Sequence, residues 1–179
     1  MFSQQTANRT NWIPWVIAIA GFWLSSNIVL DFLVMPIMYV SGMTTQTDFA
    51  TAGYSLFWSF NRVELLCAAI VLTGVLALRR NPGEFEVAYS GSRCRWALGI
   101  GLCLLSLALV DTYVLTPEMS ATALSLNSAS QTAIAPAMNW LHSAYWLLEV
   151  LKVTSLASLV WLCLIDMRDR LAATANVSL

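Results

Sequence analysis

The stretch from Trp12 to Val40 reads WIPWVIAIAGFWLSSNIVLDFLVMPIMYV and decides the fold class of this chain. It carries a single charged residue, Asp31. An α-helix needs about 20 apolar residues to cross a hydrocarbon core that is about 30 Å thick. The stretch is therefore long enough to span a bilayer. Its surplus length predicts a helix that tilts, kinks or projects beyond the lipid.

Three further apolar blocks follow, at about 54–78, 96–116 and 136–165. Hydrophobic residues make up 58% of the 179 residues and charged residues 11%, whereas a soluble domain carries about 25% charged residues. Inside lipid every backbone polar group needs an internal partner, and blocks this long achieve that as helices. The sequence predicts an all-α polytopic membrane protein, a single domain over 1–179 with four transmembrane helices in an antiparallel bundle.

The arginines outside the central parts of these blocks are distributed unevenly. They fall in the N-terminal segment, the middle loop and the C-terminal tail: Arg9, Arg79, Arg80, Arg93, Arg95, Arg168 and Arg170. With four spans these segments share one side, and the loops at 41–53 and 117–135 contain no Lys or Arg. The positive-inside rule then predicts cytoplasmic termini, in a bacterial inner membrane or a thylakoid membrane. The triplet Ala18-Ile19-Ala20 imitates a signal-peptide cleavage site, but the apolar block continues past it and favours a retained span.

The first and third spans share a short pattern. Asp31 precedes Pro36 near the end of the first span, and Asp111 precedes Pro117 near the end of the third. One reading is a duplication into two related helical hairpins, with an axis along the membrane normal. The other reading is a chance similarity, because the match is short and needs a gap of one residue.

Six charged side chains fall within the apolar blocks, and they carry the functional argument: Asp31, Arg62, Glu64, Asp111, Glu149 and Lys152. A charge at the bilayer centre costs roughly 2.5–3.5 kcal/mol on insertion scales, so such residues face the bundle interior and find partners. Glu149 and Lys152 are three residues apart and can pair on one helix face. Arg62 and Glu64 are two apart and cannot, so Arg62 is expected to pair with Asp31 or Asp111.

The four acids in this set exceed the two bases, so full ionisation would leave about two negative charges in a medium of low dielectric constant. An acid then holds a proton, or the site attracts a cation. The sequence predicts an outward-facing polar cavity for a cation, a proton or a small cationic molecule. Its predicted ligand or ion-binding residues are the six charged side chains together with His142 and Tyr145. The rival reading of the charges is that ion pairs merely fasten the four helices together. The alternative function is a non-catalytic accessory or assembly subunit of a larger membrane complex, such as a photosynthetic one, because no loop is long enough to form an independent catalytic domain. The first reading predicts a homo-oligomer, and the accessory-subunit reading predicts a larger membrane complex.

Other kinds of site have less support in the sequence. Met35, Met38 and His142 offer thioether and imidazole donors that suit Cu(I), although methionine is also an ordinary lipid-facing residue, so the metal and any cofactor stay unassigned. The chain lacks G-x-S-x-G, P-loop and G-x-G-x-x-G motifs, which favours a non-catalytic protein over an enzyme. The net charge of −1 comes without a basic patch, so we expect no nucleic-acid partner. The four cysteines lack C-x-x-C spacing and are expected to be free thiols.

Three segments carry a family resemblance. They are Val34-Met35-Pro36, the run FWSFNRVEL at 57–65, and Leu141-His142 followed by Glu149. Together they resemble small four-helix membrane proteins of cyanobacteria, which in turn are loosely similar to the transmembrane protein 205-like group and the copper-resistance D membrane domain. The resemblance implies a four-helix bundle and an activity in export or ion handling. The copper-resistance pattern uses further histidines, whereas this chain contains one histidine.

Overall fold

The computed structural model describes residues 12–43, 48–80, 92–126 and 135–177. Every element within these ranges is a helix. Four candidate spans are long and apolar enough to cross a membrane: Trp12–Val40, Thr51–Leu78, Arg93–Ala123 and Met138–Asp169. The predicted fold class, a four-helix integral membrane protein, is therefore confirmed. Arg9, one of the charges used to predict the orientation, lies outside the described residues.

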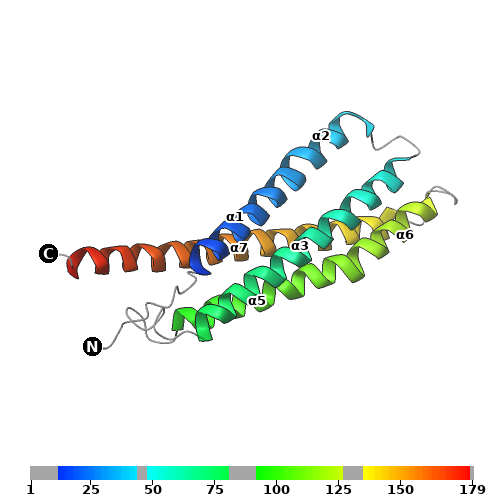
Figure 1. The fold of residues 1–179 in the computed structure, drawn as a ribbon. Coiled ribbons are helices and arrows are strands. Elements are labelled where there is room, and N and C mark those ends of the chain that lie inside the picture. Colours follow the sequence, from blue (N-terminus) through cyan, green and yellow to red (C-terminus); the bar gives the residue numbers. More distant parts are fainter. Residues whose placement is uncertain (1–11, 44–47, 81–91, 127–134, 178–179) are drawn as a thin grey trace.

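The spans are built from eight helical elements (Figure 1). The first consists of α1 (Trp12–Val29), the π-helical turn η1 (Leu30–Val34) and α2 (Met35–Val40), and the second is α3 (Phe49–Arg80). The third consists of α5 (Ser92–Val110), the π-helical turn η3 (Asp111–Leu115) and α6 (Thr116–Leu126), and the fourth is α7 (Ala135–Val177). The predicted third block ended at Thr116, but α6 prolongs that span because Pro117 begins a new helix instead of ending the old one.

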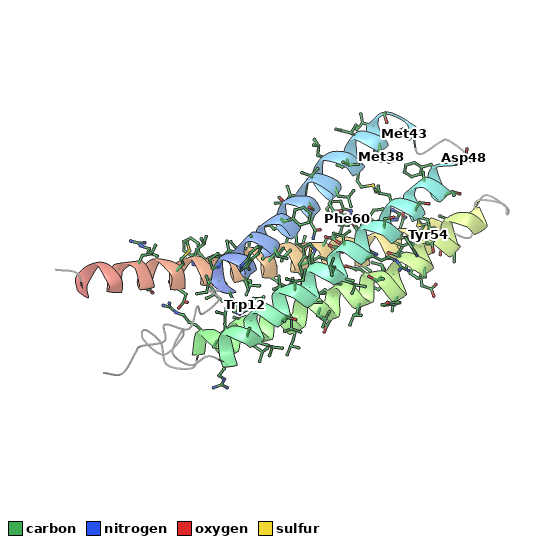
Figure 2. All side chains as sticks on the ribbon, in the orientation of Figure 1. Trp12, Met38, Met43, Asp48, Tyr54 and Phe60 are labelled. Atoms are coloured by element: carbon green, nitrogen blue, oxygen red, sulfur yellow. The ribbon has the colours of Figure 1, made fainter. Side chains whose placement is uncertain are left out.

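The spans run up and down and pack in a ring. α1 packs against α3 and α7, and α5 packs against the same two helices. At one end of the molecule, here called the terminal end, lie the starts of α1 and α5 and the end of α3; at the other, here called the loop end, lie α2 and α6 (Figure 1). In Figure 2, Trp12 marks the terminal end, and Met38, Met43 and Asp48 mark the loop end. Predicted antiparallel packing is thus observed.

The two π-helical turns each contain one of the intramembrane aspartates, Asp31 in η1 and Asp111 in η3. Pro36 follows η1 at the start of α2, and Pro117 follows η3 at the start of α6. Proline lacks an N–H donor and its ring clashes with the carbonyl four residues earlier, so an α-helix must adjust locally before it. The wider turn supplies that adjustment, and π-bulges of this kind occur frequently at functional sites. The shared distortion extends the sequence pattern, although duplication stays a prediction.

The apolar core fills the terminal half of the bundle. It consists of buried residues from all four spans: Ile13, Val16, Ala20, Trp23, Cys67, Ala68, Val71, Val75, Leu78, Ala97, Leu104, Ala108, Leu156, Leu159 and Cys163. Gly74 lets α3 approach α1 closely, because a Cβ atom at this position would lie 2.5 Å from Cγ2 of Val16. Small residues allow such close helix contacts within membranes. This packed half holds the helices in register beneath the polar residues.

The outward faces of the spans are apolar. Large side chains such as Trp15, Phe22, Leu66, Leu102 and Trp161 are exposed. In water an apolar surface of this extent would mark an interaction site or an aggregation hazard. In a bilayer it meets lipid tails, so the distribution agrees with four membrane-spanning helices.

Candidate functional site

Lys152 lies at the centre of a cluster of buried charges. Its Nζ atom is 2.5 Å from Oε1 of Glu149, 3.0 Å from Oε2 of Glu64 and 2.8 Å from Oδ2 of Asp111. The Lys152 side chain is 1% exposed. Its acids come from α3, η3 and α7 itself, so one ammonium group joins three of the four spans. The predicted pairing of Glu149 with Lys152 is confirmed.

Glu64 is the most completely paired acid in this cluster. Both of its carboxylate oxygens accept hydrogen bonds from Lys152, at 3.1 and 3.0 Å, and Oε1 also accepts one at 2.8 Å from Nε1 of Trp23 on α1. Lys152 and Glu64 therefore join α7 to α3 across the ring. Burial of a carboxylate is tolerable when donors satisfy it in this way.

Asp31 and Glu149 form the second part of the cluster. The hydroxyl of Tyr145 donates a hydrogen bond to Oδ1 of Asp31. The Glu149 carboxyl lies within hydrogen-bonding reach of Asp31. Two ionised carboxylates have no hydrogen to donate to each other, so such a contact needs a proton on one of them. Oδ2 of Asp31 and Oε2 of Glu149 have no other hydrogen-bond donor among the described residues.

Four acids and one base thus share a dry interior. Asp31, Glu64, Asp111 and Glu149 are between 1% and 4% exposed. If all four acids were ionised around Lys152, three negative charges would be uncompensated. The sequence predicted about two, because it counted Arg62 as a second base. Asn27, one helical turn before Asp31, is fully buried, and its side-chain amide has no hydrogen-bond partner in the described part of the chain. We call these five charged residues the acidic cluster; they are Asp31, Glu64, Asp111, Glu149 and Lys152.

Arg62 is not part of the acidic cluster, and its predicted pairing with Asp31 or Asp111 is wrong. Its side chain is exposed, and its guanidinium lies 3.7 Å from the centre of the Trp58 ring. Residues two apart on a helix point about 200° apart. Because Glu64 faces the bundle interior, Arg62 faces outward. Asp111 pairs with Lys152 instead, and Asp31 with Tyr145.

A cavity of about 490 Å³ lies at the loop end. Its lining combines residues from α2, α3, α6 and α7 with six aromatic side chains: Tyr39, Phe49, Tyr54, Phe57, Tyr145 and Trp146. The edge of Tyr145 packs against Phe57, with ring centres 5.8 Å apart. Tyr54, labelled in Figure 2, lies on the part of α3 that reaches the loop end. No Lys, Arg, Asp or Glu of the described ranges lines the cavity.

The cavity therefore differs from the predicted one. His142 and Tyr145 line it as expected, but Glu64, Glu149, Asp31 and Asp111 do not. The carboxylates are buried among the helices, and Tyr145 reaches them from the lining. Thr116 makes a second connection, since it lines the cavity and its Oγ1 accepts a hydrogen bond of 2.7 Å from Nδ2 of Asn61. Asn61 is one turn from Glu64 on α3.

The candidate metal donors are only partly gathered at the cavity. Met35 and His142 line it, together with Met119 and Met138, whereas Met38 does not. Nδ1 of His142 lies 2.9 Å from the carbonyl oxygen of Met138. If that nitrogen carries the hydrogen, Nε2 is free to accept a hydrogen bond. Among the described residues no group of three or more His, Cys, Asp or Glu side chains is arranged to hold a metal ion.

Comparisons with known proteins were made at three levels. No protein-family model, curated protein or solved structure matches this chain. The functional argument therefore rests on the residues of the acidic cluster and the cavity.

Two of the site's partners were missed by sequence reasoning. Trp23 looks like one more apolar residue of the first span, and Thr116 looks like a residue at the end of the third. Trp23 lies eight residues before Asp31, close to two helical turns, so it shares a face with that acid. Its helical spacing from Asp31 is the signal that could have found the indole donor.

Proposed function

We propose that this integral membrane protein binds protons in the acidic cluster and passes them to and from the loop end. The observation that carries the proposal is the excess of buried acids. Four carboxyl groups, one from each span, surround a single ammonium group, and each is at most 4% exposed. Ionisable residues in such a place are costly, and they mark ion pathways and proton relays in membrane proteins.

A proton suits this cluster better than a metal cation does. Lys152 already occupies the position between Glu64, Asp111 and Glu149 at which a bound cation would compensate charge. Asp31, the remaining acid, interacts with Glu149, and a hydrogen bond between these two carboxyl groups needs one proton. A proton also needs no coordination shell of fixed size. The cluster therefore supports proton binding by the pair of Asp31 and Glu149.

Tyr145 provides the connection to the loop end. Its hydroxyl is hydrogen-bonded to Asp31, and the residue belongs to the lining of the cavity. A hydroxyl both donates and accepts hydrogen bonds, so it can relay a proton between a carboxylate and water in the cavity. The packed core on the other side of the cluster contains buried apolar side chains from all four spans. Exchange with the loop end is accordingly the easier route.

Proton exchange at the loop end can be tested with the purified protein in lipid nanodiscs, in a weakly buffered solution that contains a pH-sensitive dye. A rapid drop from high to neutral pH drives protons into the acidic cluster, and the dye reports how many protons each protein molecule takes up. We expect the wild-type protein to take up more protons per molecule than Glu149→Gln, because the variant lacks one carboxyl group of the pair. Glu118→Gln is the matched control, since Glu118 is an exposed acid on α6. Equal proton uptake by the wild type and Glu149→Gln would overturn the proposal.

A second candidate function, an accessory or assembly subunit, is supported by Arg62. This residue lies eleven positions after Thr51, the start of its span, or about 16 Å along the helix. It is exposed beside the exposed Trp58 and has no ion pair with any described residue. An acid from a neighbouring protein would compensate its charge. Native complexes in gentle detergent test this: Arg62→Ala should release the protein from a larger complex, and an unchanged complex would contradict this role.

A further inference from the structure

The cavity at the loop end has the size and lining of a small-molecule site. Ligand pockets in proteins span roughly 300–1,000 Å³ and are mostly apolar with a few placed polar groups. This cavity measures about 490 Å³. Its polar groups include the imidazole of His142, the hydroxyl of Ser120 and Oγ1 of Thr116. Such a lining accepts a molecule that is largely apolar.

Charge complementarity selects the kind of molecule. Beneath Tyr145 the acidic cluster holds four acids against one base, whereas no Lys or Arg among the described residues lines the cavity. Six aromatic rings surround the space, and the face of an aromatic ring attracts a cation. The effect is larger where water is excluded. We infer that the cavity binds a lipophilic organic cation, whose charge is stabilised by the aromatic rings and by the acidic cluster.

This inference rests on the proposed function and names what the protons are exchanged for. When the cation enters, the pair of Asp31 and Glu149 gives up its proton through Tyr145. The carboxyl group becomes a carboxylate, one proton leaves to water at the loop end, and the net charge of the site is unchanged. The groups that face this pair are Tyr145 and Lys152 on α7, Glu64 on α3 and Asp111 on η3. Raising the pH should therefore strengthen binding of the cation.

Tetraphenylphosphonium and tetraphenylborate provide a matched pair of probes, because the two ions have nearly the same shape and opposite charge. Calorimetry on the full-length protein in lipid nanodiscs measures the affinity and the number of protons released. We expect tetraphenylphosphonium to bind at least tenfold more tightly than tetraphenylborate after subtraction of binding to empty nanodiscs. We also expect proton release on binding, seen as a heat that varies with the ionisation enthalpy of the buffer.

Two aromatic residues locate the site. Tyr54 lines the cavity and is 41% exposed, so Tyr54→Ala should leave the fold intact and weaken tetraphenylphosphonium binding about tenfold. Trp161 is an exposed aromatic residue of α7 that does not line the cavity, and Trp161→Ala should leave the affinity unchanged. Equal effects of the two substitutions would overturn the assignment of the site.

The outcomes separate this inference from the proposed function. If Glu149→Gln lowers proton uptake but neither probe binds the wild type, the inference fails and the proposed function stands. Equal binding of both probes would also overturn it, because the cavity would then be an acyl-chain or detergent site. Binding of tetraphenylphosphonium without proton release would contradict the exchange. If Glu149→Gln weakens the binding of tetraphenylphosphonium and removes proton release, the inference is supported.

Discussion

Replacement of Lys152 by methionine tests the electrostatic balance of the acidic cluster. Methionine has a similar length, so the change removes the ammonium group from Glu64, Asp111 and Glu149 with little loss of volume. Removal of one partner from a buried ion pair typically costs 3–5 kcal/mol, because an uncompensated charge remains. We expect Lys152→Met to lower the free energy of unfolding by about 3–5 kcal/mol at neutral pH.

Arg62→Met is the matched control for this prediction, since Arg62 is the other cation in the central part of the spans. Its cation–π contact with Trp58 at an exposed site contributes about 0.5–1 kcal/mol. Equilibrium unfolding by sodium dodecyl sulfate in lipid–detergent micelles, followed by circular dichroism, measures both variants. The loss of unfolding free energy in Lys152→Met should become smaller as the pH falls, because protonation removes the charge of the carboxylates that no longer have Lys152 beside them. A loss no larger than that of Arg62→Met would show that Lys152 does not compensate the charge of these carboxylates.

Two further predictions concern helix packing and topology. Gly74→Ala should destabilise the protein by about 1–3 kcal/mol, because its Cβ atom would meet Val16, whereas Gly99→Ala, in open space, should cause no loss in the same unfolding assay. A membrane-impermeant thiol reagent applied to spheroplasts should label Asp48→Cys, at the loop end, and should leave Cys94, near the positively charged end of α5, unlabelled. The opposite pattern of labelling would reverse the predicted orientation.

The four spans were predictable because each is indicated by the combined hydropathy of a long run of residues. Each block exceeds the length that a bilayer needs, and lipid leaves such a block no stable alternative to a helix. Helix distortion was not predictable in the same way. The turns at Asp31 and Asp111 depend on local competition between Pro36 or Pro117 and the preceding carbonyl groups, which a hydropathy pattern does not encode.

The sequence predicted the residues of the acidic cluster well, but it predicted the contacts between them less well. Spacing by three residues found the pair of Glu149 and Lys152. The rule that an intramembrane charge needs an acidic partner failed for Arg62, which stacks on Trp58 at the surface. Long cationic side chains can lie along apolar surfaces with the charged head elsewhere. The position of an arginine within an apolar block therefore does not determine which group it contacts. Which acid Lys152 reaches across the ring depends on packing between helices.

In the proposed mechanism Asp31 and Glu149 share a proton in the folded protein. Infrared spectroscopy of the protein in lipid membranes tests it directly, since a protonated carboxyl group has a carbonyl band separate from that of a carboxylate. We predict such a band in the wild type at neutral pH and its loss in the double variant Asp31→Asn/Glu149→Gln. Absence of the band from the wild type at neutral pH, or its persistence unchanged in the double variant, would contradict the account.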